Sequence, residues 1–186
     1  MDDIYYDYVS YWKKEGTLSK RDSLSFQLTR EHTAQESPLI NEIKQINPKS
    51  ILEIGAGWGR VARLVRNNGI TCPYTAIDIS YDRLKQIDDS TITRKVIDFV
   101  DFDPDEYDLI LAVELLMHIP PDILEDFVEK MKYHARWIIT VDYDPEDPRD
   151  IKLADHNFLH EYDKLLPNAI KTQINYVQKL RVWNGS

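Results

Sequence analysis

From residue 48 onward, short runs of hydrophobic residues alternate with stretches in which hydrophobic residues recur every three or four positions. A short unbroken run is typical of a buried strand, and the wider spacing is typical of an amphipathic helix. The pattern predicts strands at 50–54, 74–79, 95–97, 107–113 and 137–141, and helices at 58–68, 81–87 and about 121–133. Strands that alternate with helices form a parallel sheet with helices on both faces. The fold class is therefore α/β.

The two ends of the chain carry weaker patterns. Hydrophobic residues at helical spacing over 4–14 make an aromatic stripe with Tyr5, Tyr8 and Trp12, which predicts a short helix. Ser37 and Pro38 are typical of the N-cap and first turn of a second helix. Toward the end of the chain, the pattern predicts a helix near 159–166 and strands at 170–177 and 179–183.

Length and composition indicate a single domain. The chain has 186 residues, of which 42% are hydrophobic and 30% are charged, and these are ordinary values for a globular protein. We find no linker between the first helices and the strands after them. Residues 1–47 are therefore expected to form a helical cap that is part of the same domain as residues 48–186.

The net charge of the chain disfavours one class of binding partner. A net charge of −9 repels polyanions, which disfavours nucleic acid as a partner. No apolar run approaches the roughly 20 residues of a membrane helix, and the first residues lack the basic and apolar regions of a secretion signal. We therefore expect a cytoplasmic protein, and the sequence leaves its oligomeric state open. Cys72 is the only cysteine, which excludes an internal disulfide.

A glycine-rich turn comes after the first predicted strand and opens a helix. It begins after Glu53 and carries glycines at positions 55, 57 and 59. Backbone amides in such a turn can approach a bound nucleoside because no Cβ atoms intervene. The dinucleotide fingerprint would place its third glycine at position 60, where this chain has Arg60, and there is no Gly-Lys-Ser or Gly-Lys-Thr as in a P-loop.

Acidic residues stand at the ends of the next two predicted strands. Asp78 comes 23 residues after Gly55, at the spacing where a carboxylate binds both hydroxyls of a ribose. Asp98 and Phe99 come after the next strand, where an acid and an aromatic ring can bind and cover an adenine. These three elements, in this order at successive strand ends, predict a site for a nucleoside-containing ligand.

The region from about 50 to 141 resembles the class I S-adenosylmethionine-dependent methyltransferases. The resemblance implies a single Rossmann-like domain with a mostly parallel sheet of seven strands, in the order 3-2-1-4-5-7-6 and with strand seven antiparallel. It implies S-adenosylmethionine as cofactor, with the carbonyl of Val113 receiving the ammonium group. The residues expected to bind the cofactor are Glu53, Gly55, Ala56, Gly57, Asp78, Ile79, Asp98, Phe99 and Val113.

The acceptor side is expected beyond the fourth and fifth strands. Glu114 and His118 belong to a Glu-x-x-x-His-Ile stretch similar to one that many family members carry after strand four. The segment 155–162, which contains His156, resembles the His-x-x-Phe stretch that many small-molecule methyltransferases carry after strand five. We expect both histidines to line the pocket and one of them to take a proton, because an imidazole titrates near neutral pH. Glu114 and Tyr143 are expected to contact the acceptor. The favoured acceptor is a small molecule, methylated on oxygen or nitrogen without a metal.

Two methyltransferase classes are excluded by the residues directly after strand four. Enzymes that methylate nucleobase or glutamine amino groups carry Asp/Asn-Pro-Pro-Tyr residues there, whereas this chain has Val113 to Leu116. Pyrimidine C5 transfer requires a cysteine at that place, and Cys72 precedes the second strand. On the helix after the glycine turn, we interpret Arg60, Arg63 and Arg66 as a solvated face.

Two alternative functions stay open. One is a metal-assisted 2′-O-methyltransferase of RNA that uses Glu114, His118 and His156, although Met117 stands where such enzymes have a ligand. The other is a catalytically silent, cofactor-binding partner subunit. The intact glycines and Asp78 argue against the latter, because a scaffold has no physical need for a ribose carboxylate.

Overall fold

A sheet of seven strands in the order β3-β2-β1-β4-β5-β7-β6 forms the centre of the computed structural model. The structure describes residues 7–15, 30–103, 105–146, 148, 153–154 and 156–185. The strands are β1 (Ile51–Ile54), β2 (Tyr74–Asp78), β3 (Ile92–Val96), β4 (Tyr107–Val113), β5 (Ala135–Tyr143), β6 (Ile170–Gln173) and β7 (Gln178–Asn184). The described helices are α1 (Tyr8–Glu15), α3 (Arg30–Ile46), α4 (Arg60–Asn67), α5 (Tyr81–Leu84), the 3₁₀ turn η1 (Leu116–His118), α6 (Pro121–His134) and α7 (Tyr162–Leu165).

The strand directions confirm the predicted topology. Strands β3, β2, β1, β4 and β5 are parallel, and β7 runs antiparallel between β5 and β6. The central strand β1 is buried along its whole length, which explains why it is an unbroken hydrophobic run apart from Glu53. Parallel pairing brings the carboxyl ends of five strands to one edge of the sheet.

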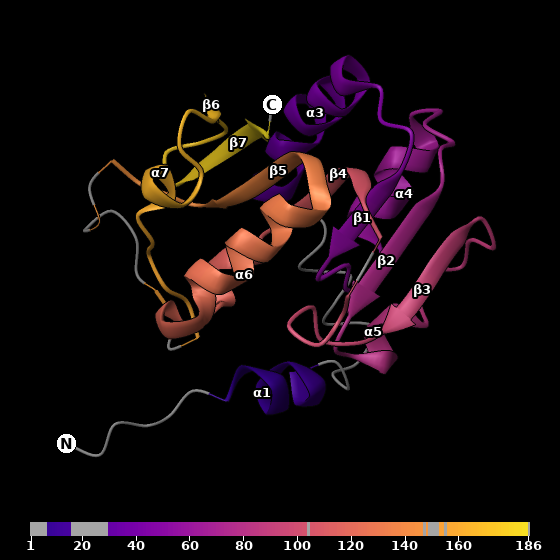
Figure 1. Ribbon diagram of the computed structural model, residues 1–186, viewed down its shortest axis with the longest axis horizontal. Helices are drawn as coiled ribbons and strands as arrows, with labels where there is room; N and C mark the ends of the chain where they lie inside the picture. Colours follow the sequence, from indigo (N-terminus) through magenta and orange to yellow (C-terminus); the bar gives the residue numbers. More distant parts are fainter. Residues whose placement is uncertain are drawn as a thin grey trace.

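Helices cover both faces of the sheet and complete three layers (Figure 1). On one face, the buried residues of α3, α4 and α5 form a core with alternate residues of the strands. On the other face, α6 and α7 pack on the remaining strand residues, such as Ile110 and Ile138. None of the helices in these described ranges is both long and apolar enough to cross a membrane.

Two elements begin at least three residues earlier than the sequence predicted. Helix α3 starts at Arg30 and runs through Pro38, which was expected to open it. The residues from Arg30 to Glu36 include Ala, Gln and Glu, which are strong helix formers, so the helix extends past the point where the proline lacks an N–H. Strand β3 starts at Ile92, but its other residues are exposed at the sheet edge. Without a hydrophobic run, only its last part was predicted.

Helix α1 lies beyond the carboxyl ends of the parallel strands, next to α5 (Figure 1). It covers most of the short helix predicted at 4–14, and Tyr5 falls outside the described residues. Its side chains contact groups that come after β2, β3 and β4, which are separated from it by at least 68 residues of sequence. The aromatic stripe on α1 is therefore directed at the edge of the sheet where open α/β folds bind ligands.

Candidate functional site

The glycine turn after β1 adopts a backbone that requires glycine. Gly55, Gly57 and Gly59 have φ angles of 70°, 53° and 79°, in the left-handed region. A Cβ on Gly55 would lie 2.7 Å from Leu115, and one on Gly59 would lie 2.5 Å from Ile87. A Cβ on Gly57 would meet nothing within 4 Å. Side chains therefore pack tightly against both ends of the loop, whereas its middle is open. We refer to this loop as the glycine cradle, because a ligand could bind at its open middle.

The carboxylate of Asp78 is fixed at the mouth of this loop. One oxygen accepts a hydrogen bond from the amide of Gly57 and the other from the amide of Ser80, each at 2.8 Å. Each oxygen keeps a second lone pair, so the carboxylate can still accept two hydroxyl protons. Burial raises the pKa of Asp78, and the two amides and the nearby Arg83 oppose this shift. This geometry fits the expected ribose-binding acid, and Ile79 comes directly after it.

Asp98 and Phe99 differ in their placement. Asp98 accepts a hydrogen bond of 2.7 Å from the hydroxyl of Tyr8 on α1 and one of 3.1 Å from the amide of Val100. The ring of Phe99 is only 2% exposed and packs on Phe127 at 4.8 Å between ring centroids. Because this ring points into the core under α6, it does not cover a ligand as the sequence analysis expected. Asp98 lies at the expected edge, but α1 already contacts it.

Glu53 is buried at the start of the glycine loop. Its carboxylate accepts a 2.8 Å hydrogen bond from the hydroxyl of Tyr74 at the beginning of β2. Burial raises the pKa of Glu53 to about 7, although this hydrogen bond and the charge of Arg60 lower it. Its contact with the cofactor stays a prediction. In the structure this acid connects β1 to β2.

Glu114 lies in a hydrogen-bonded polar network directly after β4. Its carboxylate accepts hydrogen bonds from the side-chain amides of Gln35 and Gln178, both at 2.9 Å, and from the guanidinium of Arg60 at 3.1 Å. Gln35 on α3 and Gln178 on β7 are both completely buried. The backbone of Glu114 has a φ of 54°, and its amide donates to the carbonyl of Val141. The network thus joins α3, α4, β4 and β7 around the end of β4.

The prediction of a solvated arginine face on α4 is wrong for Arg60 and Arg66, whereas Arg63 is exposed. Arg60 is paired with Glu114, and its side chain is 16% exposed. Arg66 donates to the carbonyls of Ile70 and Cys72. The three-residue spacing was read as one face, but a guanidinium reaches far enough to find partners on neighbouring strands and loops.

Four rings meet where the sequence analysis expects the acceptor side of the site. Trp12 packs on His118 at 4.5 Å, Tyr11 stacks on His156 at 4.7 Å, and the two imidazoles lie 5.4 Å apart. The hydroxyl of Tyr11 is 3.0 Å from Nδ1 of His156. The structure therefore brings together the two histidines that the sequence predicted, and it adds Tyr11 and Trp12 of α1 as their cover.

The environment of His118 keeps its imidazole neutral. Its Nδ1 lies 3.2 Å from the carbonyl oxygen of His156, so Nδ1 carries the proton and donates it. In this tautomer the lone pair is on Nε2. Burial lowers the pKa of His118 to about 4, against the opposing effects of this hydrogen bond and of Glu114. An ordinary titration near neutral pH, which the sequence analysis assumed, does not apply to this histidine.

Asp142 is a buried acid whose structural role the sequence did not indicate. It is completely buried at the end of β5, and its Oδ1 accepts a 3.2 Å hydrogen bond from the amide of Met117. The carbonyl of Met117 in turn accepts from the amide of Phe158, and that of Leu116 lies 3.0 Å from Nε2 of His160. These contacts fix the η1 turn that carries His118. The acidic segment after β5 could have suggested such a role, but nothing distinguished Asp142 from Tyr143 and Asp144.

Tyr143 is the last residue of β5 and is paired with Gln178 of β7. Gln178 donates to Glu114, which places both expected acceptor-contacting residues at the same corner of the sheet. Within the part of the chain that the structure describes, no three His, Cys, Asp or Glu side chains are grouped as for a metal ion. Glu114 accepts from three protein donors, as described above.

Arg83 on α5 connects α1 to the glycine loop. Its guanidinium lies 5.1 Å from the ring centroid of Trp12 and 4.8 Å from that of Trp58. Cation–π contacts of this kind contribute about 0.5–2 kcal/mol each. These contacts hold helix α1 against residues that come after β1, β2, β3 and β4.

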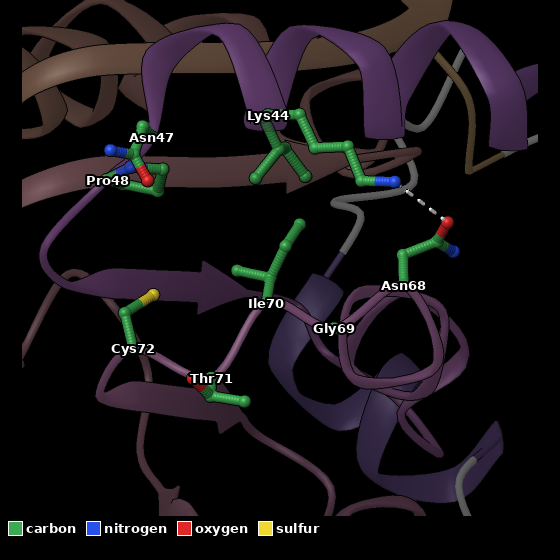
Figure 2. Close-up of a pocket in the computed structure, with 9 residues that line it drawn as sticks. Lys44, Asn47, Pro48, Asn68, Gly69, Ile70, Thr71 and Cys72 are labelled. Carbon is green, nitrogen blue, oxygen red and sulfur yellow. Dashed lines mark hydrogen bonds between the residues drawn. The ribbon is translucent and has the colours of Figure 1, made fainter.

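A groove elsewhere on the molecule lies away from these groups. Figure 2 shows it between the end of α3 and the segment from Asn68 to Cys72, with the side chain of Lys44 reaching toward Asn68. Nζ of Lys44 lies 3.4 Å from Oδ1 of Asn68. Because Pro48 and Cys72 precede β1 and β2, the groove lies at the amino ends of the strands. The candidate site is at the opposite edge.

Comparisons with known proteins agree with this fold. A family model described as a methyltransferase domain matches residues 28–177. No curated protein matches the chain. Magnesium protoporphyrin IX methyltransferase from Synechocystis PCC 6803, solved with bound SAM, superimposes with a TM-score of 0.72 at 14% identity, over 99% of this chain and 100% of that one.

Two further solved structures are similar. The plantazolicin methyltransferase BpumL in complex with SAH gives a TM-score of 0.71 at 14% identity, over 96% of this chain and 94% of that one. Human N-acetylserotonin methyltransferase in complex with SAM gives a TM-score of 0.67 at 13% identity, over 89% of this chain and 56% of that one. At such identities the likeness shows the fold alone.

The raised pKa of Glu53 predicts a pH dependence of stability. Between pH 4.5 and 7 the folded protein keeps a proton on Glu53 that the unfolded chain has lost, so the free energy of unfolding falls as pH rises through this range. Glu53→Gln keeps an acceptor for Tyr74 and has no charge to bury. We expect the free energy of unfolding of this variant to fall less between pH 4.5 and 7 than that of the wild-type protein. Urea unfolding at several pH values measures it, and an unchanged slope would contradict the assignment.

Proposed function

We propose, from the premise that the chain belongs to the S-adenosylmethionine-dependent methyltransferase superfamily, that it methylates an oxygen or nitrogen atom of a small-molecule acceptor without a metal. The observation that carries this proposal is the open glycine cradle beside the fixed carboxylate of Asp78. Solved relatives named for magnesium protoporphyrin IX, N-acetylserotonin and plantazolicin support an acceptor of this class.

The residues at the edge of the sheet fit the cofactor. S-adenosylmethionine supplies a methyl group already activated on a sulfonium, so the protein mainly has to bind and orient. The loop is open at Gly57, where a Cβ would meet nothing within 4 Å, and Asp78 accepts from the ribose hydroxyls. Asp98 serves the adenine, with Tyr8 as its second partner. The carbonyl of Val113 is the acceptor for the ammonium group.

The acceptor side assigns different tasks to the two histidines. His118 is neutral, and its Nε2 lone pair can accept a hydrogen bond from the acceptor and orient it. His156 is only half-buried and is in contact with Tyr11, which makes it the better candidate to remove a proton. Tyr143 and Glu114 define the corner of the pocket, with Glu114 acting through the network that it organises.

We propose that the cap, residues 1–47, belongs to the same domain as residues 48–186. Leu39, Ile40 and Ile43 of α3 belong to the hydrophobic core, and α1 covers the edge of the sheet with aromatic side chains. An arrangement of this kind excludes water from a methyl-transfer site. The net charge of −9 supports a small-molecule acceptor over nucleic acid, and a cytoplasmic location stays part of the proposal.

The first test is cofactor binding by calorimetry with S-adenosylmethionine and S-adenosylhomocysteine. Asp78→Ala removes charge-assisted hydrogen bonds to the ribose, so affinity for both should fall by roughly 10–150-fold. Asp82→Ala is the matched control, because Asp82 on α5 pairs only with Lys85 among the described ion pairs. No heat with wild-type protein at millimolar cofactor would refute the proposed function.

The second test concerns the cover formed by α1. Hydrogen exchange over Tyr8–Glu15 should slow on addition of S-adenosylhomocysteine, because the ligand gives the aromatic side chains a further surface. Trp12→Ala removes the contacts with His118 and Arg83 and should weaken this protection. Lys13→Ala changes an exposed neighbour and should not. Exchange that is insensitive to ligand would make α1 a fixed part of the structure.

The third test separates the two histidines once an acceptor is in hand. His156→Gln should lower turnover by about 10²–10⁴ with cofactor affinity kept, as expected for loss of a general base. His118→Gln should raise KM more than it lowers kcat, because Gln still offers a hydrogen-bond acceptor. Turnover within a few-fold of wild type for both variants would leave the site without a base among these residues.

A further inference from the structure

We propose that Asp142 is a positioning residue for His118, an inference that rests on the proposed function. In that function, the Nε2 lone pair of His118 orients the acceptor. His118 belongs to the η1 turn that follows β4, whereas Asp142 belongs to β5. The proposed function gives Asp142 no task of its own.

The η1 turn has no cap within its own segment. The first amides of a helical turn lack partners inside the turn, and a side-chain oxygen of the residue before it usually accepts from one of them. That residue is Leu115, whose side chain has no oxygen and makes no capping hydrogen bond. The amides at the start of the turn that carries His118 therefore need an acceptor from elsewhere in the protein.

Asp142 supplies that acceptor from the neighbouring strand. Its Oδ1 accepts a 3.2 Å hydrogen bond from the amide of Met117, which is 25 residues away in sequence. The amide of Leu116 is also close enough to lower the pKa of this carboxyl. Strand β5 is paired with β4 on one side and with β7 on the other, so Asp142 binds the turn from a backbone that is itself held on both sides.

The burial of Asp142 is the second support. The side chain is completely buried, at a position where a hydrophobic residue would avoid the cost of burying a carboxyl. Burial raises the pKa of Asp142 well above its ordinary value, although the amide of Met117 and the charge of Arg181 lower it. A raised pKa favours the neutral carboxyl, which still accepts from an amide. Accepting this hydrogen bond, rather than carrying a charge, is therefore the task that the position demands.

The imidazole of His118 depends on where the turn lies, because His118 comes directly after Met117. Its Nδ1 is 3.2 Å from the carbonyl oxygen of His156, and its ring packs on Trp12 at 4.5 Å between ring centroids. A displaced turn would lengthen the contact to this carbonyl. The proton would then no longer be fixed on Nδ1, and the lone pair would no longer be fixed on Nε2.

The segment after residue 155 also contacts the turn, but through different groups. The amide of Phe158 donates to the carbonyl of Met117, and Nε2 of His160 lies 3.0 Å from the carbonyl of Leu116. These contacts occupy carbonyls of the turn, whereas Asp142 accepts from an amide. Of these three contacts, that of Asp142 is the one that connects the turn to the sheet.

The test is the nitrogen NMR spectrum of the His118 imidazole in the isotope-labelled, ligand-free protein. Asp142→Leu removes the acceptor at similar volume, and Asp142→Asn keeps an acceptor without a carboxyl. Asp108→Leu is the matched control, because Asp108 on β4 also accepts from a backbone amide, that of Lys49, but at the amino ends of the strands. A spectrum of His118→Gln identifies the signals, and thermal unfolding establishes that each variant is folded.

The expected result is a loss of the fixed tautomer in one variant. At neutral pH, wild-type protein, Asp142→Asn and Asp108→Leu should each show a single tautomer of His118, with the proton on Nδ1. Asp142→Leu should show averaging between the two tautomers. Its His118 should also have a pKa above the wild-type value of about 4, because a displaced ring is less buried. Lower stability alone would not change the tautomer of the folded protein. If Asp142→Leu does not fold, Asp142→Ala replaces it.

Several outcomes would overturn this role of Asp142. One is a wild-type His118 with its proton on Nε2, and another is a single Nδ1–H tautomer that persists in folded Asp142→Leu or Asp142→Ala. Averaging in Asp142→Asn would assign the effect to the charge of the carboxylate, and averaging in Asp108→Leu would make it unspecific.

Calorimetry of the wild-type protein with S-adenosylhomocysteine keeps the proposed function separate from this test. The NMR spectra are recorded without cofactor, so they report the position of His118 whether or not the cofactor binds. An absence of heat would refute the proposed function, and with it the use of His118 for an acceptor. Binding together with an unaltered tautomer in Asp142→Leu would refute only the role of Asp142.

Discussion

Burial of the central strands on both faces is the constraint on which the rest of this structure depends. β1 is buried throughout, and most of β4 is inaccessible between α3 or α4 on one side and α6 on the other. Polar chemistry is therefore confined to the ends of the strands, where the backbone leaves the sheet. Because β1 to β5 are parallel, their carboxyl ends are adjacent, and residues distant in sequence become neighbours. For this reason, the same edge of the sheet carries the glycine turn, Asp78, Asp98 and Glu114.

Sequence reasoning succeeded where one physical signal controls the structure. The hydrophobic run of β4 gave its bounds at 107–113, and the spacing of glycines and acids located the candidate cofactor edge. It failed where the outcome depends on tertiary partners. Strand β3 has a single buried residue, so its start left no hydrophobic signal. Phe99 comes after an acid as expected, but only the three-dimensional core determines that its ring packs on Phe127.

The polar residues whose roles were missed share one property. Gln35, Arg60 and Asp142 each bond to a group at least 25 positions away, so nothing in their local sequence marks them. A buried carboxylate such as Glu114 is stable only with donors close by, and those donors come from α3, α4 and β7. The acid could be predicted from its place after β4. Its partners become predictable only once the sheet order brings these elements together.

In the proposed function, helix α1 introduces a conflict between two requirements of a methyl-transfer site. Covering the acceptor side with Tyr11 and Trp12 excludes water, which favours binding and orientation. The same cover removes the solvent that would stabilise an imidazolium, and burial lowers the pKa of His118 to about 4. The more completely α1 closes over His118, the weaker this histidine is as a base. A proton acceptor for the reaction must therefore lie where water or a hydroxyl still reaches it. His156, half-buried and in contact with the hydroxyl of Tyr11, meets this condition.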